Sequence, residues 1–487
     1  MEIATISFAF CILGTLAVGL WASRRGKSEA VDYLLSSRDH GAVVTSLSAS
    51  ATDVSGWVLM GLVGMAFSTG LGVLWVIPAG LLGYALNWGL VARRIRERSK
   101  ADGFVTFPGF LASGYSSKMS AAVRLITSIV ILVFLTYYVS GQFNAAGKAL
   151  RTFFEIPYEL GVIVALAISL PYVIVAGMRG TSWSDVVQAS LIGIAVIFVP
   201  IAALSHVGGL GSVVEGLRNI DPAMVSLTSG KSGSDAILHI VFWLSIGLAY
   251  PGQPQILTRF MAAKDDHAVT RGRWIAVGWF LLVSTMAVLA GLTARVGFAD
   301  NAAIVQDSEQ IIPALAALFL PAVLVGVVLA AVTAAIMSTA DSMVLVLLTT
   351  LLADIRNVDS AKTKSFSIAT RIGVGTIVAG TAAAIAFLSE RKVFTVVLEA
   401  WAILGGAFVA VVFYRLWWDR TSPVATLAGI IAGLVAALFL NGDNYQIQIA
   451  ASIIASAVAV AIAHVATAKA TPLPQIADTP NSSEGVS

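Results

Sequence analysis

Long runs of apolar residues dominate this chain and restrict what it can fold into. A helix needs about 20 such residues to cross a bilayer. Only 12% of the 487 residues are charged, whereas a soluble globular chain averages about 25%. The sequence therefore predicts an all-α integral membrane protein with 13 transmembrane helices, at 3–21, 42–68, 71–91, 121–148, 159–177, 186–206, 234–256, 273–297, 311–353, 365–388, 396–416, 423–440 and 446–466.

Two of these runs need comment. The first is too long for the core of a signal peptide and has no basic residue before it, so we expect a membrane helix there. The ninth, 311–353, is too long for one crossing. We expect a short outer helix before Pro321 and the spanning helix after it.

The loops between the runs predict the orientation. Most of the 30 lysines and arginines fall in alternate loops on one side, which the positive-inside rule assigns to the cytoplasm. This places the N-terminus outside and the C-terminus inside the cell (inner) membrane. The polar tail, 467–487, is then cytoplasmic and too short for a folded domain.

The stretch Ser48–Trp57 is the most unusual part of the second run. It carries Asp53 in an otherwise apolar segment, with four hydroxyl residues and Gly56 close by. A charge at bilayer depth costs roughly 2.5–3.5 kcal/mol on insertion scales. Small polar residues of this kind favour an interrupted helix whose freed carbonyls hold a cation. The alternative is a polar residue that only joins two helices.

A second interruption is predicted in the seventh run, within 242–254. Pro251 and Pro254 lack backbone donors, and Gly247 and Gly252 allow the helix to unwind. An ordinary proline kink is the alternative. Two broken runs five helices apart are typical of an inverted-repeat transporter with a site at mid-membrane. The predicted divisions are 1–41 (first helix and inner loop), 42–206 and 207–416 (the repeats), 417–466 (two accessory helices) and the tail.

Polar residues also gather in the ninth and sixth runs. Ser338, Asp341 and Ser342 share one helix face, with Thr339 beside them. Hydroxyls can bond back to the preceding turn, but that does not account for an aspartate. An oxygen-only environment suits sodium better than a transition metal. Asp185, at the start of the sixth run, either caps that helix or takes part in ion binding.

Other functional classes find little support. The chain has one cysteine and five histidines without ligand spacing, and no nucleophile–base pair or phosphate-binding loop is visible. We expect no enzyme, no nucleic-acid partner and no metal other than sodium. A transporter-like solute sensor and a channel remain alternatives, although a channel needs polar residues along its whole length.

Four segments resemble the sodium/solute symporter family, and within it the sodium/proline symporters. They are 48–62, 182–190, 252–262 and 334–339, and the similarity runs along nearly the whole chain. The resemblance implies a leucine-transporter-type fold of two inverted five-helix repeats, with one extra N-terminal and two extra C-terminal helices. It also implies coupling to sodium.

The resemblance further implies individual roles. The main sodium site corresponds to Ala51, Val54, Ala335, Ser338 and Thr339. Asp53 corresponds to an acidic residue on which sodium coupling depends; this residue holds the broken helix rather than touching the ion. A second cation site found in sialic-acid members corresponds to Asp185, Ser338, Asp341 and Ser342. Position 341 is usually a hydroxyl residue, so its aspartate could strengthen that site, bind a proton or pair with another cation.

The substrate site implied by the resemblance is Ser55, Gly56, Trp57, Tyr138, Ile246, Tyr250 and Pro254. Ile246 stands where the family has tryptophan, which removes a flat wall. The expected function is sodium-coupled uptake of a small solute, first of all proline, by alternating access. The alternatives are a sodium- or proton-coupled symporter of another amino acid, organic acid or sugar, or a solute sensor.

Overall fold

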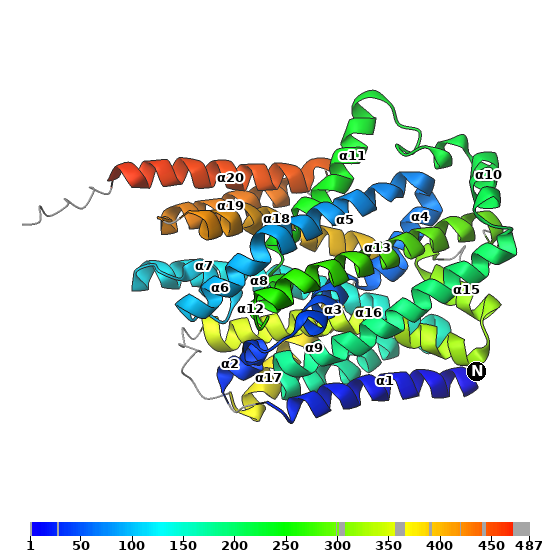
Figure 1. Ribbon diagram of the computed structural model, residues 1–487, viewed down its shortest axis with the longest axis horizontal. Helices are drawn as coiled ribbons and strands as arrows, with labels where there is room; N and C mark the ends of the chain where they lie inside the picture. The colour runs from blue at the N-terminus through cyan, green and yellow to red at the C-terminus, as the bar shows by residue number, and fades with distance from the viewer. Residues whose placement is uncertain are drawn as a thin grey trace, which may run out of the picture.

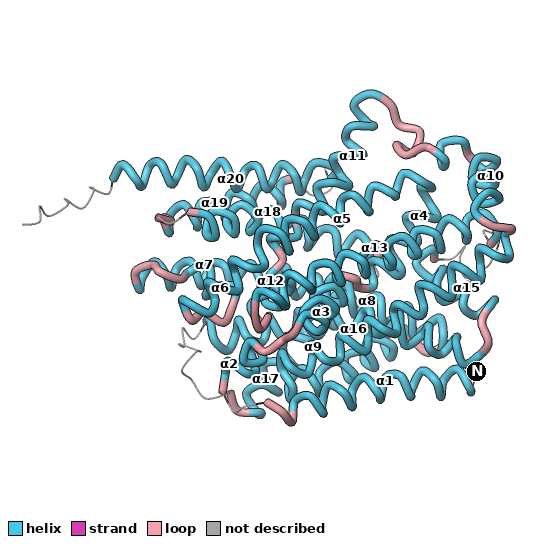
Figure 2. Tube along the Cα trace, in the orientation of Figure 1, coloured by secondary structure: helices cyan, strands magenta, loops and turns pink. Residues whose placement is uncertain are grey.

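The computed structural model of the protein describes residues 2–26, 29–298, 300, 307–355, 366–388, 392–418, 420–440 and 445–470. Helices dominate these ranges, and most of them run along the long axis of the molecule (Figures 1 and 2). Nine helices in the described ranges are long and apolar enough to cross a membrane, and shorter apolar helices accompany them. The predicted all-α membrane class is confirmed, and the number of thirteen crossings stays a prediction.

The helices follow one another with few long connections. The first part of the chain forms α1 (Glu2–Ser23), α2 (Ala30–Leu35), η1 (Ser36–Arg38), α3 (Ala42–Asp53), η2 (Trp57–Leu62), α4 (Val63–Thr69), η3 (Gly70–Trp75), α5 (Val76–Tyr84), η4 (Ala85–Val91), α6 (Ala92–Asp102), α7 (Phe107–Ala112) and α8 (Ser117–Phe154). The middle forms α9 (Tyr158–Val207), α10 (Leu210–Ile220), η5 (Pro222–Val225), α11 (Gly233–Leu248), η6 (Tyr250–Gly252), α12 (Pro254–Met261) and α13 (Asp266–Gly297). The last part forms η7 (Ser308–Gln310), α15 (Ile311–Phe319), α16 (Ala322–Thr349), η8 (Thr350–Asp354), α17 (Ile368–Leu388), α18 (Val393–Trp417), α19 (Pro423–Phe439) and α20 (Tyr445–Ala470).

The second predicted span is broken where its polar residues lie. Helix α3 ends at Asp53, and Val54 has φ −78° and ψ 92°, an extended conformation. The chain becomes helical again at Trp57, in the wide-turned segment η2. A break of this kind frees backbone carbonyls inside the protein, where other groups must satisfy them.

The seventh predicted span is broken as well. Helix α11 ends at Leu248, the short turn η6 follows, and Gln253 is extended with φ −96° and ψ 104°. Pro254 then occupies the first position of α12, where its missing N–H costs nothing. Both interruptions predicted from glycine, proline and hydroxyl residues are therefore present.

Helix α9 contains the fifth and sixth predicted spans in one continuous element. Gly177 divides it, with φ 55° and ψ −149°. A Cβ at this position would lie 2.5 Å from the carbonyl oxygen of Tyr33. Only glycine fits both the positive φ and the close approach of α2.

Helix α16 lies at the centre of the molecule. It follows the short helix α15, as predicted, with Pro321 as its N-cap residue. Every residue from Val328 to Thr349 is buried, and the helix packs against α1, α3, α8 and α9. Its polar residues therefore meet protein on all sides and not lipid. Helices α19 and α20 pack against α18 at one flank (Figure 1).

Candidate functional site

Two hydroxyl groups of α16 reach the broken end of α3. The Ser338 hydroxyl donates to the carbonyl oxygen of Ala51 at 2.8 Å, and the Thr339 hydroxyl donates to that of Thr52 at 3.0 Å. The carbonyl oxygen of Ala335 lies 3.1 Å from the Ser338 hydroxyl and 3.4 Å from the Thr339 hydroxyl. Both hydroxyl residues are fully buried. Four of the five residues predicted for sodium binding thus lie together.

Val54, the fifth of these residues, is the point at which α3 loses its helical conformation. Its N–H still donates to Ser50 at 2.8 Å. The cluster around it contains carbonyl and hydroxyl oxygens, a donor set that suits a hard alkali ion. In the described part of the chain, no group of three or more His, Cys, Asp or Glu residues could hold another metal.

Asp53 ties the two broken helices together. Its Oδ2 accepts hydrogen bonds from the hydroxyls of Tyr250 at 2.9 Å and Tyr84 at 3.3 Å. Its backbone carbonyl accepts from the indole N–H of Trp57 at 3.0 Å, across the break. Tyr250 belongs to η6, so one carboxylate connects the interruption of the second span with that of the seventh. Asp53 therefore does more than join two unbroken helices.

The predicted substrate residues of the second span face α8. The N–H of Gly56 donates to Gln142 Oε1 at 3.3 Å. Tyr138, on the same helix, is buried and its hydroxyl faces Ser55. A Cβ on Gly56 would lie 3.0 Å from Ala145 Cβ and 3.2 Å from Ile336. The break is therefore closely packed on the side of α8.

Trp57 and Ile246 line a common apolar cavity of about 20 Å³, together with Phe394, Val397, Leu398 and Trp401. This is space for about one water molecule, so an amino acid can enter only if the surrounding helices move apart. The indole of Trp401 donates to the carbonyl oxygen of Ile246 at 3.0 Å and packs edge-on against Tyr250, with ring centroids 4.8 Å apart.

The other predicted substrate residues lie elsewhere. Tyr250 borders a separate cavity of about 10 Å³ with Asp53 and Tyr84. Pro254 begins α12, and it lines neither this cavity nor the one beside Trp57. Six of the seven predicted substrate residues thus lie in or beside the two broken segments and Tyr138 lies on α8, but the seven do not surround one cavity.

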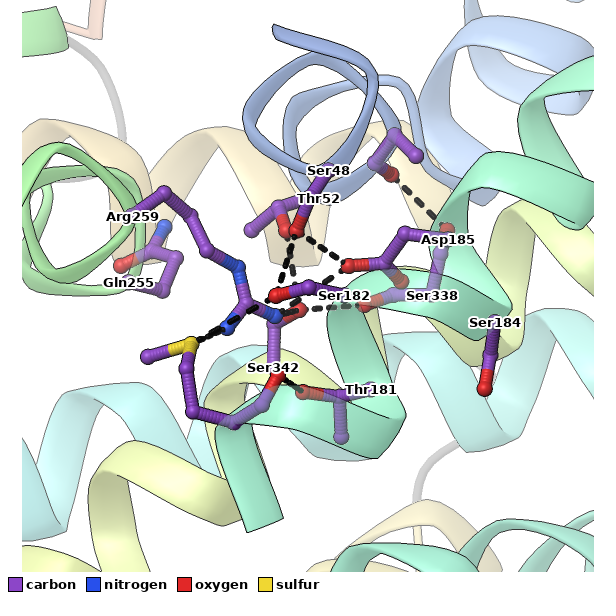
Figure 3. A network of polar contacts seen from close by, with 12 residues as sticks. Ser48, Thr52, Thr181, Ser182, Ser184, Asp185, Gln255, Arg259, Ser338 and Ser342 are labelled. Carbon is purple, nitrogen blue, oxygen red and sulfur yellow. Dashed lines mark hydrogen bonds and ion pairs between the residues drawn. The ribbon is translucent and has the colours of Figure 1, made fainter. Parts of the chain in front are cut away.

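The residues of the second cation site implied by the resemblance contact a residue that lies beyond the end of the predicted seventh run, 234–256. Figure 3 shows Arg259, from α12, pointing toward Asp185 and Ser342. Its Nη2 lies 3.3 Å from Asp185 Oδ2 and donates to the hydroxyl of Ser342. Both charged side chains are 1% exposed. A guanidinium group therefore lies where the resemblance implied a second metal ion.

Asp185 is a partner in this network and not a helix cap. It lies about two turns beyond the break at Gly177, too deep in α9 to cap its second half. The Ser48 hydroxyl donates to its Oδ2 at 2.6 Å, which connects α9 with α3. Interpreting Asp185 as a capping residue alone is wrong.

Ser342 joins this network to the oxygen cluster. Its hydroxyl donates to the carbonyl oxygen of Ser338 at 2.7 Å and lies 2.8 Å from the hydroxyl of Thr52. Asp341, in contrast, stands apart from both groups. It is fully buried, and its carboxylate faces the hydroxyl of Ser169 on α9.

Arg259 was missed because the predicted seventh span ended at residue 256, whereas α12 continues to Met261. The signal was present in the sequence, because two buried aspartates in apolar runs require a positive partner.

The loop before α3 contacts the end of α12, since the N–H of His40 donates to the carbonyl oxygen of Ala262 at 3.2 Å. Burial, with the charges of Arg259 and Arg179, lowers the pKa of His40 to about 3, so His40 is neutral at physiological pH.

Fold and site together define a multi-pass helical membrane protein with two broken helices that meet at a buried polar centre. The profile of the sodium:solute symporter family matches residues 33–433. The chain belongs to this family.

Relatives of known function cover most of the chain. It is 35% identical over 422 residues to the high-affinity proline transporter PutP of Bacillus subtilis, covering 86% of this chain and 88% of the relative. It is 33% identical over 440 residues to the sodium/proline symporter of Escherichia coli, with coverages of 89% and 86%. The osmoregulated proline transporter OpuE of B. subtilis is 30% identical over 438 residues, with coverages of 89% and 87%.

Two solved structures show the same helical architecture. A sodium-coupled sialic acid symporter in an outward-open state matches with a TM-score of 0.78 and 17% identity, covering 96% of this chain and 98% of that one. The nucleobase-cation-symport-1 family transporter Mhp1, in a closed conformation with bromovinylhydantoin bound, matches with a TM-score of 0.56 and 13% identity, at coverages of 92% and 96%. The fold is therefore of the leucine-transporter type.

Proposed function

We propose that the protein carries out sodium-coupled uptake of a small solute, with proline as the first candidate, by alternating access. The observation that carries this proposal is the contact of the Ser338 and Thr339 hydroxyls with the carbonyls of Ala51 and Thr52. One sodium ion bound by Ala51, Val54, Ala335, Ser338 and Thr339 would link α16 to the broken end of α3.

Sodium binding acts on the substrate segment through the chain itself. A hydroxyl hydrogen that now points at a carbonyl rotates away, so that the hydroxyl and carbonyl oxygens all present lone pairs to the ion. The ion then fixes Ala51 and Val54, which are followed at once by Ser55, Gly56 and Trp57. Asp53 transmits the ordering to Tyr250 through the hydrogen bond between them.

The choice of proline rests on the relatives and on the apolar walls. The three proline-transporting relatives cover more than four fifths of the chain. Ile246 replaces the aromatic wall expected from the family, and Trp401, whose indole bonds to Ile246, provides a flat apolar surface beside it. Solute enters this region when the helices around Trp57, Tyr138, Tyr250 and Pro254 separate.

The topology proposed for this cycle follows the positive-inside rule. The N-terminus lies outside and the C-terminus in the cytoplasm, with 42–206 and 207–416 as the two repeats. In support, the start of α1 and the end of α20 lie at opposite ends of the molecule (Figure 1). Each sodium ion that crosses 100 mV releases about 2.3 kcal/mol, which sustains an accumulation of about fifty-fold.

Uptake of labelled proline into proteoliposomes, with and without an inward sodium gradient, tests the proposal. We expect uptake above equilibrium with the gradient only. Equal uptake in both cases contradicts sodium coupling. Competition by unlabelled amino acids, organic acids and sugars identifies the solute, and displacement by another class alone contradicts the choice of proline.

A second candidate is coupling to protons, and one observation favours it. Asp341 is fully buried, and its carboxylate faces the Ser169 hydroxyl and no cationic side chain among the described residues. An unpaired buried charge is costly, and binding a proton would remove it. A second sodium ion at Asp185, Ser338, Asp341 and Ser342 would in turn have to displace Arg259 from Asp185. Replacement of Asp341 by serine separates these cases. If protons drive uptake, D341S abolishes the coupling; if sodium drives uptake, the sodium dependence of D341S is intact.

A further inference from the structure

A basic cavity lies where α6, α7 and the start of α8 meet the end of α18. Its volume is about 780 Å³, and four arginines line it, against one acidic side chain, Asp102, among the described lining residues. The arginines are Arg98, Arg124, Arg415 and Arg420. This end of the molecule carries the segments that the positive-inside rule assigns to the cytoplasm.

The charges of these arginines are only partly neutralised by the protein. Arg124 lies 3.3 Å from the carboxylate of Asp354. Arg415 donates to the backbone carbonyl of Ser113 at 2.5 Å, and Arg98 donates to the carbonyl of Arg415. Carbonyl groups accept hydrogen bonds but do not cancel charge. In the described part of the chain, Arg124 is the one member of the four with a carboxylate partner, so the cavity keeps a positive excess.

An apolar groove adjoins this cavity. Its volume is about 450 Å³, and α18 and α20 supply most of its lining, including Phe413, Ile453 and Ala461. Trp418 lines both the groove and the basic cavity and is 54% exposed. A tryptophan in this position is typical of the boundary between hydrocarbon and headgroups. The groove itself therefore belongs to the lipid-facing side of α20, where Ile454, Val458 and Ile462 are also exposed.

We propose that the cavity and the groove together bind one anionic phospholipid. Its phosphate lies against the guanidinium groups of Arg98 and Arg420, which match phosphate oxygens in geometry and charge. One acyl chain follows the groove between α18 and α20. Basic pockets between membrane helices on the cytoplasmic side are suited to anionic headgroups.

The lining distinguishes among possible occupants. A zwitterionic headgroup would bring a positive amine into a cavity that already has excess positive charge. A free anion such as phosphate would leave the adjoining apolar groove without a role. An anionic diacyl lipid satisfies both spaces at once, and this inference does not depend on which solute the protein carries.

Native mass spectrometry of the delipidated full chain, titrated with phosphatidylglycerol or with phosphatidylcholine of the same acyl chains, tests the proposal. We expect one phosphatidylglycerol to bind at least about tenfold more tightly than phosphatidylcholine, since about 1.4 kcal/mol corresponds to a factor of ten. Millimolar inorganic phosphate should not displace it. Equal affinity for the two lipids overturns the proposal.

Three variants and one control locate the site. R98Q/R420Q should lower the affinity for phosphatidylglycerol about tenfold, and R420Q alone should lower it by less. A461W fills the groove without changing charge and should also weaken binding. R24Q/R25Q removes two arginines just beyond the end of α1 and should have no effect. Equal weakening in R24Q/R25Q indicates general surface attraction, and normal binding in A461W indicates a free-anion site; either result overturns the proposal.

Discussion

Asp53, Asp185 and Asp341 are buried aspartates of the central helices, and each has a different environment. Asp53 accepts hydrogen bonds from two tyrosines, Asp185 pairs with Arg259, and Asp341 faces the hydroxyl of Ser169. The sequence marks each as unusual, because a buried charge is costly, and for Asp185 it leaves helix capping and ion binding both open. It does not predict these differences, since the partners lie 31 to 197 residues away in the chain.

Replacement of Asp53 tests whether its carboxylate holds the broken helices in place. D53A removes an acceptor shared by two tyrosine hydroxyls, so that of Tyr250 loses its bond to the carboxylate and that of Tyr84 keeps only its bond to Ser50 at 3.3 Å. D53N keeps one acceptor. We expect D53A to raise the sodium concentration for half-maximal uptake more than tenfold, and D53N to have a smaller effect. Sodium titration of uptake measures this, with E215A on the exposed face of α10 as a control. An unchanged sodium dependence in D53A would contradict the role of Asp53 in holding the broken helices in place.

The ion pair between Asp185 and Arg259 is open to a double-mutant cycle. R259Q leaves a buried carboxylate without its partner, so the expected loss of stability is about 3–5 kcal/mol. R259Q/D185N removes both charges and should recover part of that loss. Thermal and denaturant unfolding in detergent provide the four free energies. If the two single changes simply add, the pair makes no coupled contribution.

At the scale of helices, the two breaks were predictable and their contacts were not. Proline, glycine and clustered hydroxyls mark residues 48–57 and 242–254 as interrupted, because each weakens a helix by a local mechanism. The contact between Thr52 and Ser342 joins residues 290 positions apart, and no local pattern specifies such a pairing. The end of the seventh span was placed too early for a related reason, since Arg259 is tolerated in α12 only through its distant partner Asp185.

Glycine at a helix contact provides a test at this scale. A Cβ on Gly247 of α11 would lie 1.9 Å from the carbonyl oxygen of Ala79 in α5, so G247A must separate the two helices. We expect it to destabilise the protein by about 1–3 kcal/mol and to impair uptake. Gly193 of α9 has no atom within 4 Å of the same position, and G193A should be neutral in both unfolding and uptake. Equal behaviour of the two variants would contradict the packing described.

In the whole molecule, the polar residues of α3 and α16 lie inside an apolar core, and large apolar side chains are exposed on the outer helices. Helix α16 is enclosed on all sides, while α1 and α20 expose large apolar side chains such as Phe10 and Ile454. This arrangement allows the spans around α16 to move relative to one another without exposing the oxygen cluster to lipid. The oxygen cluster that we propose as the sodium site contacts α3 directly and is connected to α12 through Ser342 and Arg259.

Direct binding of radioactive sodium to the purified protein tests the central claim that an alkali ion joins α3 to α16. We predict saturable binding to the wild-type chain. S338A/T339A removes two ligands and should weaken it at least about tenfold, and S190A, an exposed serine on α9, should leave it unchanged. Sodium binding of equal affinity in wild type and S338A/T339A would contradict the account.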